Sequence, residues 1–359
     1  MAARVMIMAG GTGGHVFPAL AVAEELRGRG CSLSWLGTPD SFEARLVPQH
    51  GIELDTIAAH RLRGQGALAR LLAPWHLLRA MVQAAGVLRR RRPQVVLGMG
   101  GFVAGPGGLV SRLLGIPLVI HEQNTVPGLT NRWLARLANR VLEAFPGTFP
   151  EGPRVHACGN PVRRAIAALP PPRERIATDP AAPLRLLVMG GSLGAQALNE
   201  TLPQALALLP EAARPRVLHQ TGRGKLESTR ADYRRLGVSA ELAEFIPDVP
   251  AALMRSDLVI CRAGALTIAE LAAAGLGAVL VPYPHAVDDH QTRNARYLAD
   301  AGAAVLLPQP ELSPERLAEL LQDLGGDRAR LLAMAERARA HARPDAAACV
   351  AEQLLEVAA

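Results

Sequence analysis

Apolar runs alternate with helical stretches along the first half of the chain. The run 5–8 leads into a glycine loop and then into the segment 16–26, an order typical of strand, loop and helix. Three further apolar runs, at 32–36, 95–97 and 118–120, are separated by stretches of helical periodicity. Strands that alternate with helices predict right-handed βαβ units and a parallel sheet.

The order of apolar run and glycine loop appears a second time in the middle of the chain. Residues 184–189 are apolar and lead into the glycine turn 190–195, and apolar runs follow at 258–260 and 278–281. The stretch 165–183 is rich in Ala and Pro and is interpreted as a linker. The repeated start predicts an α/β protein of two Rossmann-like domains that face a central cleft. Ligand sites are then expected at the carboxyl ends of the strands.

Composition agrees with α/β layers. Hydrophobic residues make up 49% of the chain and aromatic residues only 3%, so the core is built mainly from Leu, Val, Ile and Ala. The net charge of +7 favours an anionic partner: nucleic acid, a phosphorylated substrate or a membrane surface. The scarcity of aromatic residues argues against nucleic-acid binding by base stacking. We recognise no signal peptide and no apolar run of the ~18 residues a spanning helix needs. A cytoplasmic protein with only peripheral membrane contact is therefore expected.

The four cysteines are Cys31, Cys158, Cys261 and Cys349. They lie far apart in the chain and form no CxxC pair. This spacing predicts reduced thiols and supports neither a zinc site nor a disulfide framework.

The most informative loop is 9–15, Ala-Gly-Gly-Thr-Gly-Gly-His. Its glycines allow close approach to a ligand, and the helix beyond presents free N–H groups to an anion. The loop does not match the dinucleotide-binding fingerprint, because Val16 occupies the position of the third glycine. The chain also lacks the Gly-Lys followed by Ser or Thr of an ATPase phosphate loop. His15 follows the loop and is a candidate for proton transfer. The alternative is a plain strand–helix turn.

Polar loops also follow the strands predicted in the second half. Ser192, in the loop 190–195, could contribute a hydroxyl to a phosphate site or merely cap a helix. Glu270 is expected in the first turn of the helix after 258–260, with a ribose diol as its partner, or else as a surface glutamate matched to the helix dipole. The loop 285–291 suits sugar hydroxyls better than a metal ion, because its Asp and His spacing matches neither an HExxH helix nor a zinc ribbon.

The stretch 68–92 combines apolar and basic residues. Six apolar residues recur at helical spacing before a run of four arginines: Leu68, Leu71, Leu72, Trp75, Leu78 and Val82, then Arg89, Arg90, Arg91 and Arg92. Such a stretch can lie on an anionic membrane surface. The alternative is a core-facing stripe with solvated cations at the end of a helix.

Taken together, six segments resemble the MurG family, which is glycosyltransferase family 28. They are 10–18, 98–108, 121–124 (His-Glu-Gln-Asn), 159–163 (Gly-Asn-Pro-Val-Arg), the loop from 190, and 262–267 (Arg-Ala-Gly-Ala-Leu-Thr). The resemblance implies a GT-B fold. It implies an acceptor- and membrane-facing domain over 1–162, to which a C-terminal helix at about 342–359 returns, and a UDP-sugar-binding domain over 163–341.

The resemblance also implies roles for individual residues. His15 is the expected catalytic base. Ile246 is expected at the uracil with Arg163 nearby, Ser192 at the diphosphate and Gln291 at the sugar. Acceptor-side contacts are implied for Thr12, Gly13, Gly14 and Asn124, and donor-side contacts for Ala265, Leu266, Thr267, Ile268, Ala269 and Glu270, the last at the ribose.

The family's reaction is an inverting transfer of N-acetylglucosamine from UDP-N-acetylglucosamine to the C4 hydroxyl of lipid I, giving lipid II for peptidoglycan. No bound metal is expected, because helix N-termini and Ser192 can stabilise the leaving diphosphate. The expected location is the cytoplasmic face of the bacterial plasma membrane. Two alternatives remain: another nucleotide-sugar enzyme, such as an epimerase or a transferase with a soluble acceptor, and a non-catalytic UDP-sugar-binding module.

Overall fold

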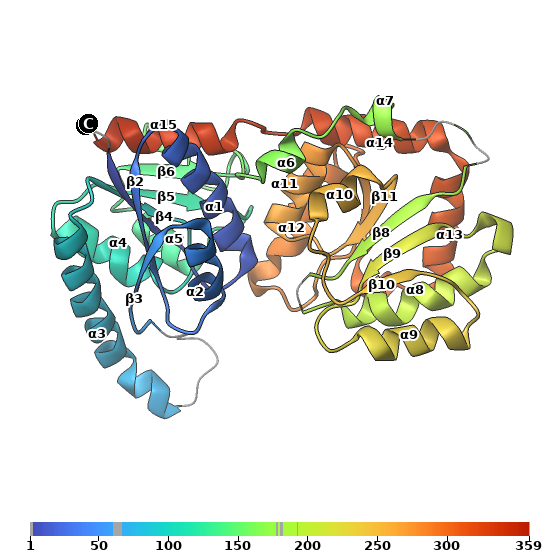
Figure 1. Cartoon of the computed structure of the whole chain (residues 1–359), viewed down its shortest axis with the longest axis horizontal. Coiled ribbons are helices and arrows are strands. Elements are labelled where there is room, and N and C mark those ends of the chain that lie inside the picture. Colours follow the sequence, from blue (N-terminus) through green and yellow to red (C-terminus); the bar gives the residue numbers. More distant parts are fainter. Residues whose placement is uncertain (1–2, 60–66, 177–178, 180–181, 192, 359) are drawn as a thin grey trace. The chain divides into compact units, whose positions relative to one another are not determined.

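The computed structural model describes residues 3–59, 67–176, 179, 182–191 and 193–358. The side chains of 67–72 and 287 are not among them. The chain divides into two compact units (Figure 1). Unit 1 comprises Met1–Arg163 and Arg343–Ala359, and unit 2 comprises Arg164–Ala342.

Unit 1 is built on a seven-stranded parallel sheet in the order β3-β2-β1-β4-β5-β6-β7. Its strands are β1 (Arg4–Met8), β2 (Ser32–Gly37), β3 (Glu53–Thr56), β4 (Val95–Gly98), β5 (Leu118–Glu122), β6 (Arg140–Glu143) and β7 (Val155–Ala157). Every pairing in it is parallel. The central strands are buried on both faces, which explains their continuous apolar runs.

Helices cover both faces of this sheet. They are α1 (Gly13–Gly28), α2 (Phe42–Leu46), α3 (Ala67–Arg91), α4 (Ala104–Leu113), α5 (Leu129–Leu134) and α15 (Ala346–Ala358), with the 3-10 turn η1 (Val47–His50). Successive side chains of β1 point to opposite faces of the sheet, and each face is packed against a different set of helices. Val5 and Ile7 share a core with α1 and α15, whereas Met6 and Met8 share one with α3 and α4.

Unit 2 repeats the plan with a six-stranded parallel sheet in the order β10-β9-β8-β11-β12-β13. Its strands are β8 (Arg185–Met189), β9 (Arg216–Gln220), β10 (Glu241–Ala243), β11 (Leu258–Cys261), β12 (Gly277–Leu280) and β13 (Ala304–Leu306). Its helices are α6 (Arg164–Ala167), α7 (Pro172–Arg175), α8 (Gln196–Leu208), α9 (Leu226–Arg235), α10 (Val249–Met254), α11 (Ala265–Ala274), α12 (His290–Ala299), α13 (Pro314–Gly326) and α14 (Arg328–Ala340), with 3-10 turns η2 (Glu211–Ala213), η3 (Val287–Asp289) and η4 (Gln309–Glu311). The predicted α/β architecture of two Rossmann-like sheets is confirmed.

The prediction of a linker over 165–183 is wrong. The described part of this stretch carries α6 and α7 and belongs to unit 2. Arg175, at the end of α7, is buried and donates to the carbonyl oxygens of Leu253 at 3.4 Å and Gly275 at 2.8 Å. Proline-rich sequence here starts a packed helix, because Pro172 occupies the first helical position, where no N–H is needed.

The expectation of four reduced thiols is also wrong. Cys158, just after β7, and Cys349, in α15, form a disulfide with their Cα atoms 5.6 Å apart. Cys31 and Cys261 are free. The pairing was hidden because 191 residues separate the two cysteines in the chain, and only the packing of α15 on unit 1 brings them together.

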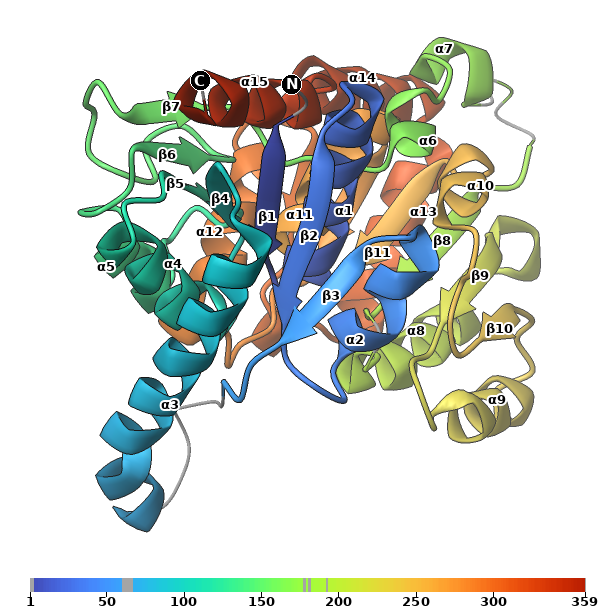
Figure 2. The same ribbon diagram turned by 60° about the vertical axis from the view of Figure 1, so that its left-hand side comes forward.

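The helical spacing over 68–92 corresponds to α3, which begins at Ala67 and contains Pro74 in its interior. Figure 2 shows α3 extending away from the sheet of unit 1 beside α4 and α5. Among the described residues, no helix combines the length and the apolar character needed to cross a membrane.

Candidate functional site

His15 lies in the first turn of α1, directly after the glycine loop that follows β1. Its imidazole Nδ1 is 2.9 Å from the side-chain oxygen Oε1 of Gln123. Gln123 comes directly after β5, and β1 and β5 both neighbour β4 in the sheet. The loop 9–15 and the His-Glu-Gln-Asn segment therefore meet at the carboxyl edge of the sheet in unit 1.

His121, the last residue but one of β5, lies behind this pair. Its Nε2 is 2.9 Å from the carbonyl oxygen of Gly159, and its Nδ1 is 3.1 Å from Nε2 of Gln123. Burial lowers the pKa of His121 to about 4. His121 therefore stays neutral at physiological pH and serves as a fixed part of the hydrogen-bond network rather than as a proton carrier.

The glycine loop is supported from behind by a buried carboxylate, that of Glu43 in α2. Its oxygens accept the N–H of Gly11 at 3.1 Å and the N–H and hydroxyl of Thr38 at 3.1 and 2.8 Å. Burial raises the pKa of Glu43, but these hydrogen bonds outweigh that effect and hold it below its ordinary value. The loop thus has a fixed conformation, with Thr12 as the N-cap of α1 and Gly13 and Gly14 as its first two residues.

Asn124 is anchored beside the same edge. Its backbone N–H and its side-chain amide both donate to Oε1 of Glu122, at 3.0 and 3.1 Å. The other oxygen of that buried carboxylate accepts from the N–H of Gly128 and from the amide of Asn131. Glu122 thereby orders the turn that carries Asn124.

Arg163 is the last residue of unit 1 before the chain enters unit 2. Its guanidinium carbon lies 5.2 Å from the ring centre of Phe17, in α1, which is a cation–π contact. Phe17 in turn packs edge-on against Phe42.

In unit 2, polar loops follow the neighbouring strands β8, β11 and β12. Ser192 lies outside the described residues. The glycine loop after β8 is packed tightly, since a Cβ on Gly194 would lie 2.0 Å from the carbonyl oxygen of Thr221. Ile246 is buried, and its neighbour Phe245 is exposed.

The loop after β11 leads into α11, which begins at Ala265 with Gly264 as its N-cap. Glu270 is therefore in the second turn of α11, and the expectation of a first-turn position is wrong. The six residues expected to contact the donor differ in solvent exposure. Ala265, Ile268 and Glu270 are buried, and Leu266, Thr267 and Ala269 are half-buried.

Gln291, at the start of α12, accepts the N–H of Tyr283 at 2.9 Å. Arg262 fixes the chain after β12, because it donates to the carbonyl oxygens of Val281 and Pro282 at 3.1 Å each. Burial lowers the pKa of Arg262. No group of three or more His, Cys, Asp or Glu side chains arranged to hold a metal ion occurs among the described residues.

Sequence reasoning missed several residues of these networks, among them Gln123, Glu43 and Arg262. Gln123 and Arg262 lie inside segments that were singled out, so their residue type was a usable signal. Glu43 carried no local signal, because a glutamate in a short helix is ordinary until its burial is known.

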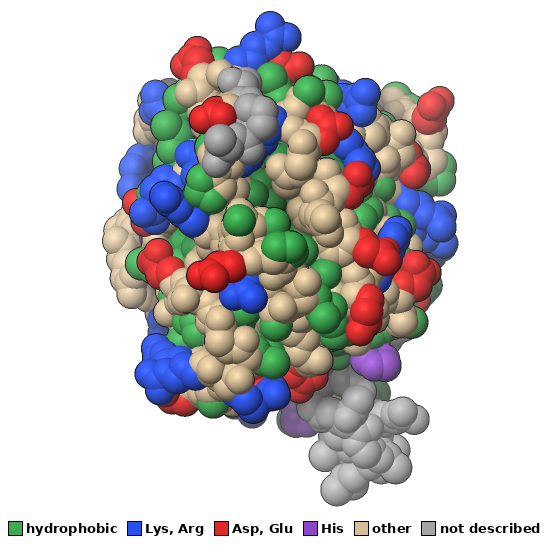
Figure 3. Space-filling view, turned by 90° about the vertical axis from the view of Figure 1, so that its right-hand side faces the viewer, with side chains coloured by type: hydrophobic (Ala, Val, Ile, Leu, Met, Phe, Trp, Pro, Cys, Tyr) green, Lys and Arg blue, Asp and Glu red, His purple; other side chains and the backbone are tan. Residues whose placement is uncertain are grey.

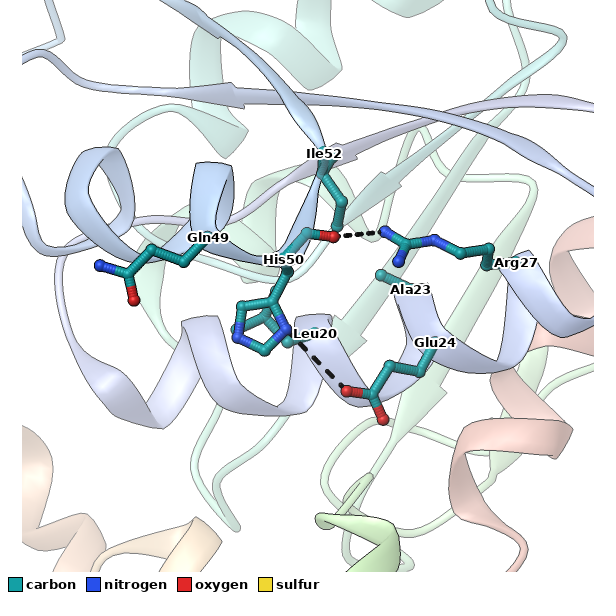
Figure 4. A pocket seen from close by; sticks show the side chains of 7 residues that line it. All are labelled: Leu20, Ala23, Glu24, Arg27, Gln49, His50 and Ile52. Carbon is teal, nitrogen blue, oxygen red and sulfur yellow. Dashed lines mark hydrogen bonds and ion pairs between the residues drawn. The ribbon is translucent and has the colours of Figure 1, made fainter. Parts of the chain in front are cut away.

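A separate cavity of about 250 Å³ lies between α1 and the segment around η1 (Figure 4). It is lined by Leu20, Ala23, Glu24, Arg27, Gln49, His50 and Ile52. His50 Nδ1 lies 4.0 Å from Oε1 of Glu24, and Arg27 donates to the carbonyl oxygen of His50 at 2.7 Å. None of the expected site residues lines it.

Comparison with known proteins identifies the family of this chain. The sequence model of the glycosyltransferase family 28 N-terminal domain matches residues 5–143, and that of the C-terminal domain matches 185–350. The UDP-N-acetylglucosamine–N-acetylmuramyl-(pentapeptide) pyrophosphoryl-undecaprenol N-acetylglucosamine transferase of Neisseria meningitidis serogroup C (strain 053442) is 57% identical over 355 residues, which cover 99% of this chain and 98% of that protein.

Two solved structures are informative. MurG of Acinetobacter baumannii is 43% identical, covers 99% of both chains and has a TM-score of 0.82. UDP-GlcNAc 2-epimerase from Neisseria meningitidis, covering 98% of this chain and 100% of its own, has a TM-score of 0.68 at 13% identity, a likeness that shows the fold alone. The two matching domains and the full-length relatives show that this chain belongs to glycosyltransferase family 28.

Proposed function

We propose that this protein transfers N-acetylglucosamine from UDP-N-acetylglucosamine to the C4 hydroxyl of the N-acetylmuramoyl unit of lipid I, giving lipid II and UDP. The observation that carries the proposal is identity of 55–57% over nearly the full length of relatives named for this transfer. Their common name specifies the sugar donor and the undecaprenol-linked acceptor.

The acceptor side of the reaction is assigned to unit 1. His15 is the proposed general base, which takes the proton of the C4 hydroxyl as that oxygen attacks the anomeric carbon. Thr12, Gly13, Gly14 and Asn124 are proposed to bind the acceptor. The support is their common position at the carboxyl ends of β1 and β5, where α/β sheets bind ligands.

The donor side is assigned to unit 2. The loops after β8, β11 and β12 are neighbours in the sheet order, so their residues can contact one nucleotide sugar. Ser192 is proposed at the diphosphate, and the residues from Ala265 to Ala269 at the start of α11 are proposed to line the donor site. Glu270 is proposed at the ribose, and Gln291 at the sugar. Ile246 is proposed at the uracil, and a donor-side role is also proposed for Arg163.

The leaving UDP carries negative charge that the site must stabilise. The N–H groups at the start of α11 are preorganised donors for an anion, because four N–H groups at a helix start lack helical partners. We therefore propose that transfer requires no bound metal ion. Activity retained in the presence of a chelator supports this, and activity restored only by adding back a divalent cation contradicts it.

Peripheral docking on an anionic membrane surface is proposed for the acceptor-side unit, since its acceptor is lipid-linked. The side chains of Leu68, Leu71 and Leu72 lie outside the described ones. Trp75, Leu78 and Val82 of α3 are 65%, 51% and 65% exposed. Arg90 and Arg91 are both paired with Asp55, although the side chain of Arg90 stays 63% exposed.

The helices packed beside α3 also carry exposed apolar side chains. α3 packs on α4 and α4 on α5 (Figure 2). Their exposed apolar side chains include Leu113 and Trp133, which are 71% and 61% exposed, and Arg136 stacks on Trp133 at 4.6 Å. By contrast, the face in Figure 3 intersperses acidic, basic and hydrophobic side chains. Exposed apolar side chains flanked by arginines are suited to an interface rich in anionic lipid.

One assay separates this proposal from its alternatives. Radiolabelled UDP-N-acetylglucosamine is incubated with the full chain and a lipid I analogue, and label is followed into lipid, into free sugar and into the 2-epimer. Transfer to lipid supports the proposal. An epimerised nucleotide sugar without transfer, label moved only to a soluble acceptor, or tight UDP-sugar binding without turnover would each contradict it.

A further inference from the structure

Gln123 is the residue that connects His15 to the interior of unit 1. Its oxygen Oε1 lies 2.9 Å from Nδ1 of His15. Its nitrogen Nε2 lies 3.0 Å from the carbonyl oxygen of Met99, and 3.1 Å from Nδ1 and 3.3 Å from the carbonyl oxygen of His121. Gln123 is 1% exposed, so water does not compete for these contacts.

The surroundings of Gln123 fix which way its amide points. Carbonyl oxygens only accept hydrogen bonds, so the amide nitrogen must face Met99 and His121. The amide oxygen then faces His15, and it too can only accept. The hydrogen between Oε1 and Nδ1 must therefore belong to His15. In the neutral imidazole this leaves the lone pair on Nε2.

His121 reinforces this arrangement. Its Nε2 faces the carbonyl oxygen of Gly159 and must donate to it, so in the neutral ring its Nδ1 accepts from the amide of Gln123. Both amide hydrogens of Gln123 thus have acceptors, in the carbonyl of Met99 and the ring of His121. Rotating the amide by half a turn would break these two bonds and place the amide oxygen of Gln123 against the carbonyl oxygen of Met99.

The ring of His15 is also confined by shape. A Cβ on Gly100 would lie 2.8 Å from both Cε1 and Nδ1 of His15, closer than real contacts allow. Gly100 has φ of +96°, a conformation that other residues rarely adopt. The imidazole therefore lies directly on the Gly100 backbone, between the loops that follow β1, β4 and β5.

We propose that Gln123 is a positioning residue that holds His15 in the Nδ1–H tautomer and so leaves Nε2 as its basic nitrogen. This inference rests on the proposed function, in which His15 is the base. As the acceptor oxygen forms its bond to the anomeric carbon, its proton passes to Nε2, and UDP leaves with the electron pair of the broken bond. The neutral amide of Gln123 orients the imidazolium without trapping the proton, so the ring can return it to water.

Nitrogen NMR on the full chain tests the tautomer without any substrate. The chain has 10 histidines, so the ¹⁵N signals of His15 in histidine-labelled protein are assigned by their loss in His15→Gln. At a pH where imidazoles are neutral, the wild-type protein is expected to show a protonated Nδ1 and an unprotonated Nε2. A wild-type ring protonated at Nε2 would overturn the inference, whatever the transfer assay gives.

The variant Gln123→Met removes the amide and keeps the side-chain length. His15 is expected to shift toward the Nε2–H tautomer, the more abundant form of a free neutral histidine side chain. The matched control is Asn199→Leu in unit 2, which deletes the amide whose Oδ1 lies 3.0 Å from Nε2 of buried His219. That control must leave the His15 signals in place. Unchanged His15 signals in Gln123→Met would overturn the inference.

Kinetics then separate positioning from general stabilisation. Gln123→Met is expected to lower kcat by about 10-fold, the factor an ordinary hydrogen bond supplies, with KM for UDP-N-acetylglucosamine near wild type. In a His15→Gln background the same change should have no further effect on kcat. An equal loss in both backgrounds would show that Gln123 does not act through His15. A protein with the expected tautomer but no transfer activity would instead refute the proposed function alone.

Discussion

Cys158 and Cys349 are joined by a disulfide although 191 residues separate them in the chain. The bond ties α15, the last helix, to the end of β7, and α15 contributes Val350, Ala351 and Leu354 to the core beneath β1. The C-terminal segment is therefore joined to the sheet of unit 1 both covalently and by packing.

Breaking this bond should destabilise unit 1. Cys349→Ser, or a reducing agent, is expected to lower the free energy of unfolding by about 2–5 kcal/mol, because the oxidised unfolded chain is held in a long loop. Urea titration with and without reductant measures the change. Cys31→Ser, at a free and half-buried cysteine, is the matched control and should respond to reductant as the wild type does. Four reactive thiols in the denatured, unreduced protein, instead of two, would contradict the bond.

His15→Ala should reduce the turnover number about 10²- to 10⁴-fold at saturating substrates, since a positioned base supplies a factor of that order. The KM for UDP-N-acetylglucosamine should change little, because the donor contacts are assigned to unit 2. Initial rates with a lipid I analogue measure both. His50→Ala, at a half-exposed histidine of η1 outside the proposed site, is the control and should keep wild-type rates. A near wild-type turnover number for His15→Ala would refute the assignment.

The carboxylate of Glu43 should make stability depend on pH. Its pKa is lowered in the folded protein, where hydrogen bonds outweigh burial, from an ordinary value of 4.5. Its contribution is therefore fully present above about pH 4.5 and is lost as the pH falls through the folded pKa. Glu43→Gln should cost about 1–3 kcal/mol at neutral pH, because an amide cannot accept all three donors. The difference from wild type should shrink in acid.

Chemical denaturation across a pH series measures this difference. Glu151→Gln, at an exposed carboxylate after β6, is the control and should change stability little at any pH. If the difference in the free energy of unfolding between wild type and Glu43→Gln became larger on acidification, the role given to Glu43 would be contradicted.

The apolar surface of α3 should bind anionic vesicles. Replacing Trp75, Leu78 and Val82 together by Ser is expected to weaken binding at least about 10-fold, because each buried apolar side chain contributes about 1.5–3 kcal/mol. Co-sedimentation with phosphatidylglycerol vesicles at two salt concentrations measures it, with weaker binding at high salt. Leu208→Ser, at an exposed leucine of α8 in unit 2, is the control.

Tryptophan fluorescence gives a second readout of the same contact. The chain has three tryptophans, and Trp35 is fully buried whereas Trp75 and Trp133 are exposed. A blue shift on adding vesicles therefore reports on α3 and α5, and Trp133→Phe isolates the contribution of Trp75. No shift and no loss of binding in the triple variant would place the membrane contact elsewhere.

Local pattern was sufficient for the family and for the strands β1, β2, β4, β5, β8, β11 and β12. Their apolar runs and the glycine loop before His15 could be recognised because hydrophobicity and backbone freedom are properties of a few consecutive residues. The strands β3, β6, β7, β9, β10 and β13 were not predicted. The six motif segments, compared as a set, indicated the glycosyltransferase family that the relatives show.

Pairings between distant residues needed the tertiary structure. His15, Gly100 and Gln123 lie in three separate motifs, and only the strand order β1-β4-β5 brings them together. The sequence by itself thus determined the strands with long apolar runs, the two glycine loops and the family. Only the tertiary structure decided that Gln123 binds His15, that Asp55 takes Arg90 and Arg91, and that Cys158 meets Cys349. The physical reason is that such contacts depend on strand order and helix packing, which no local stretch of sequence encodes.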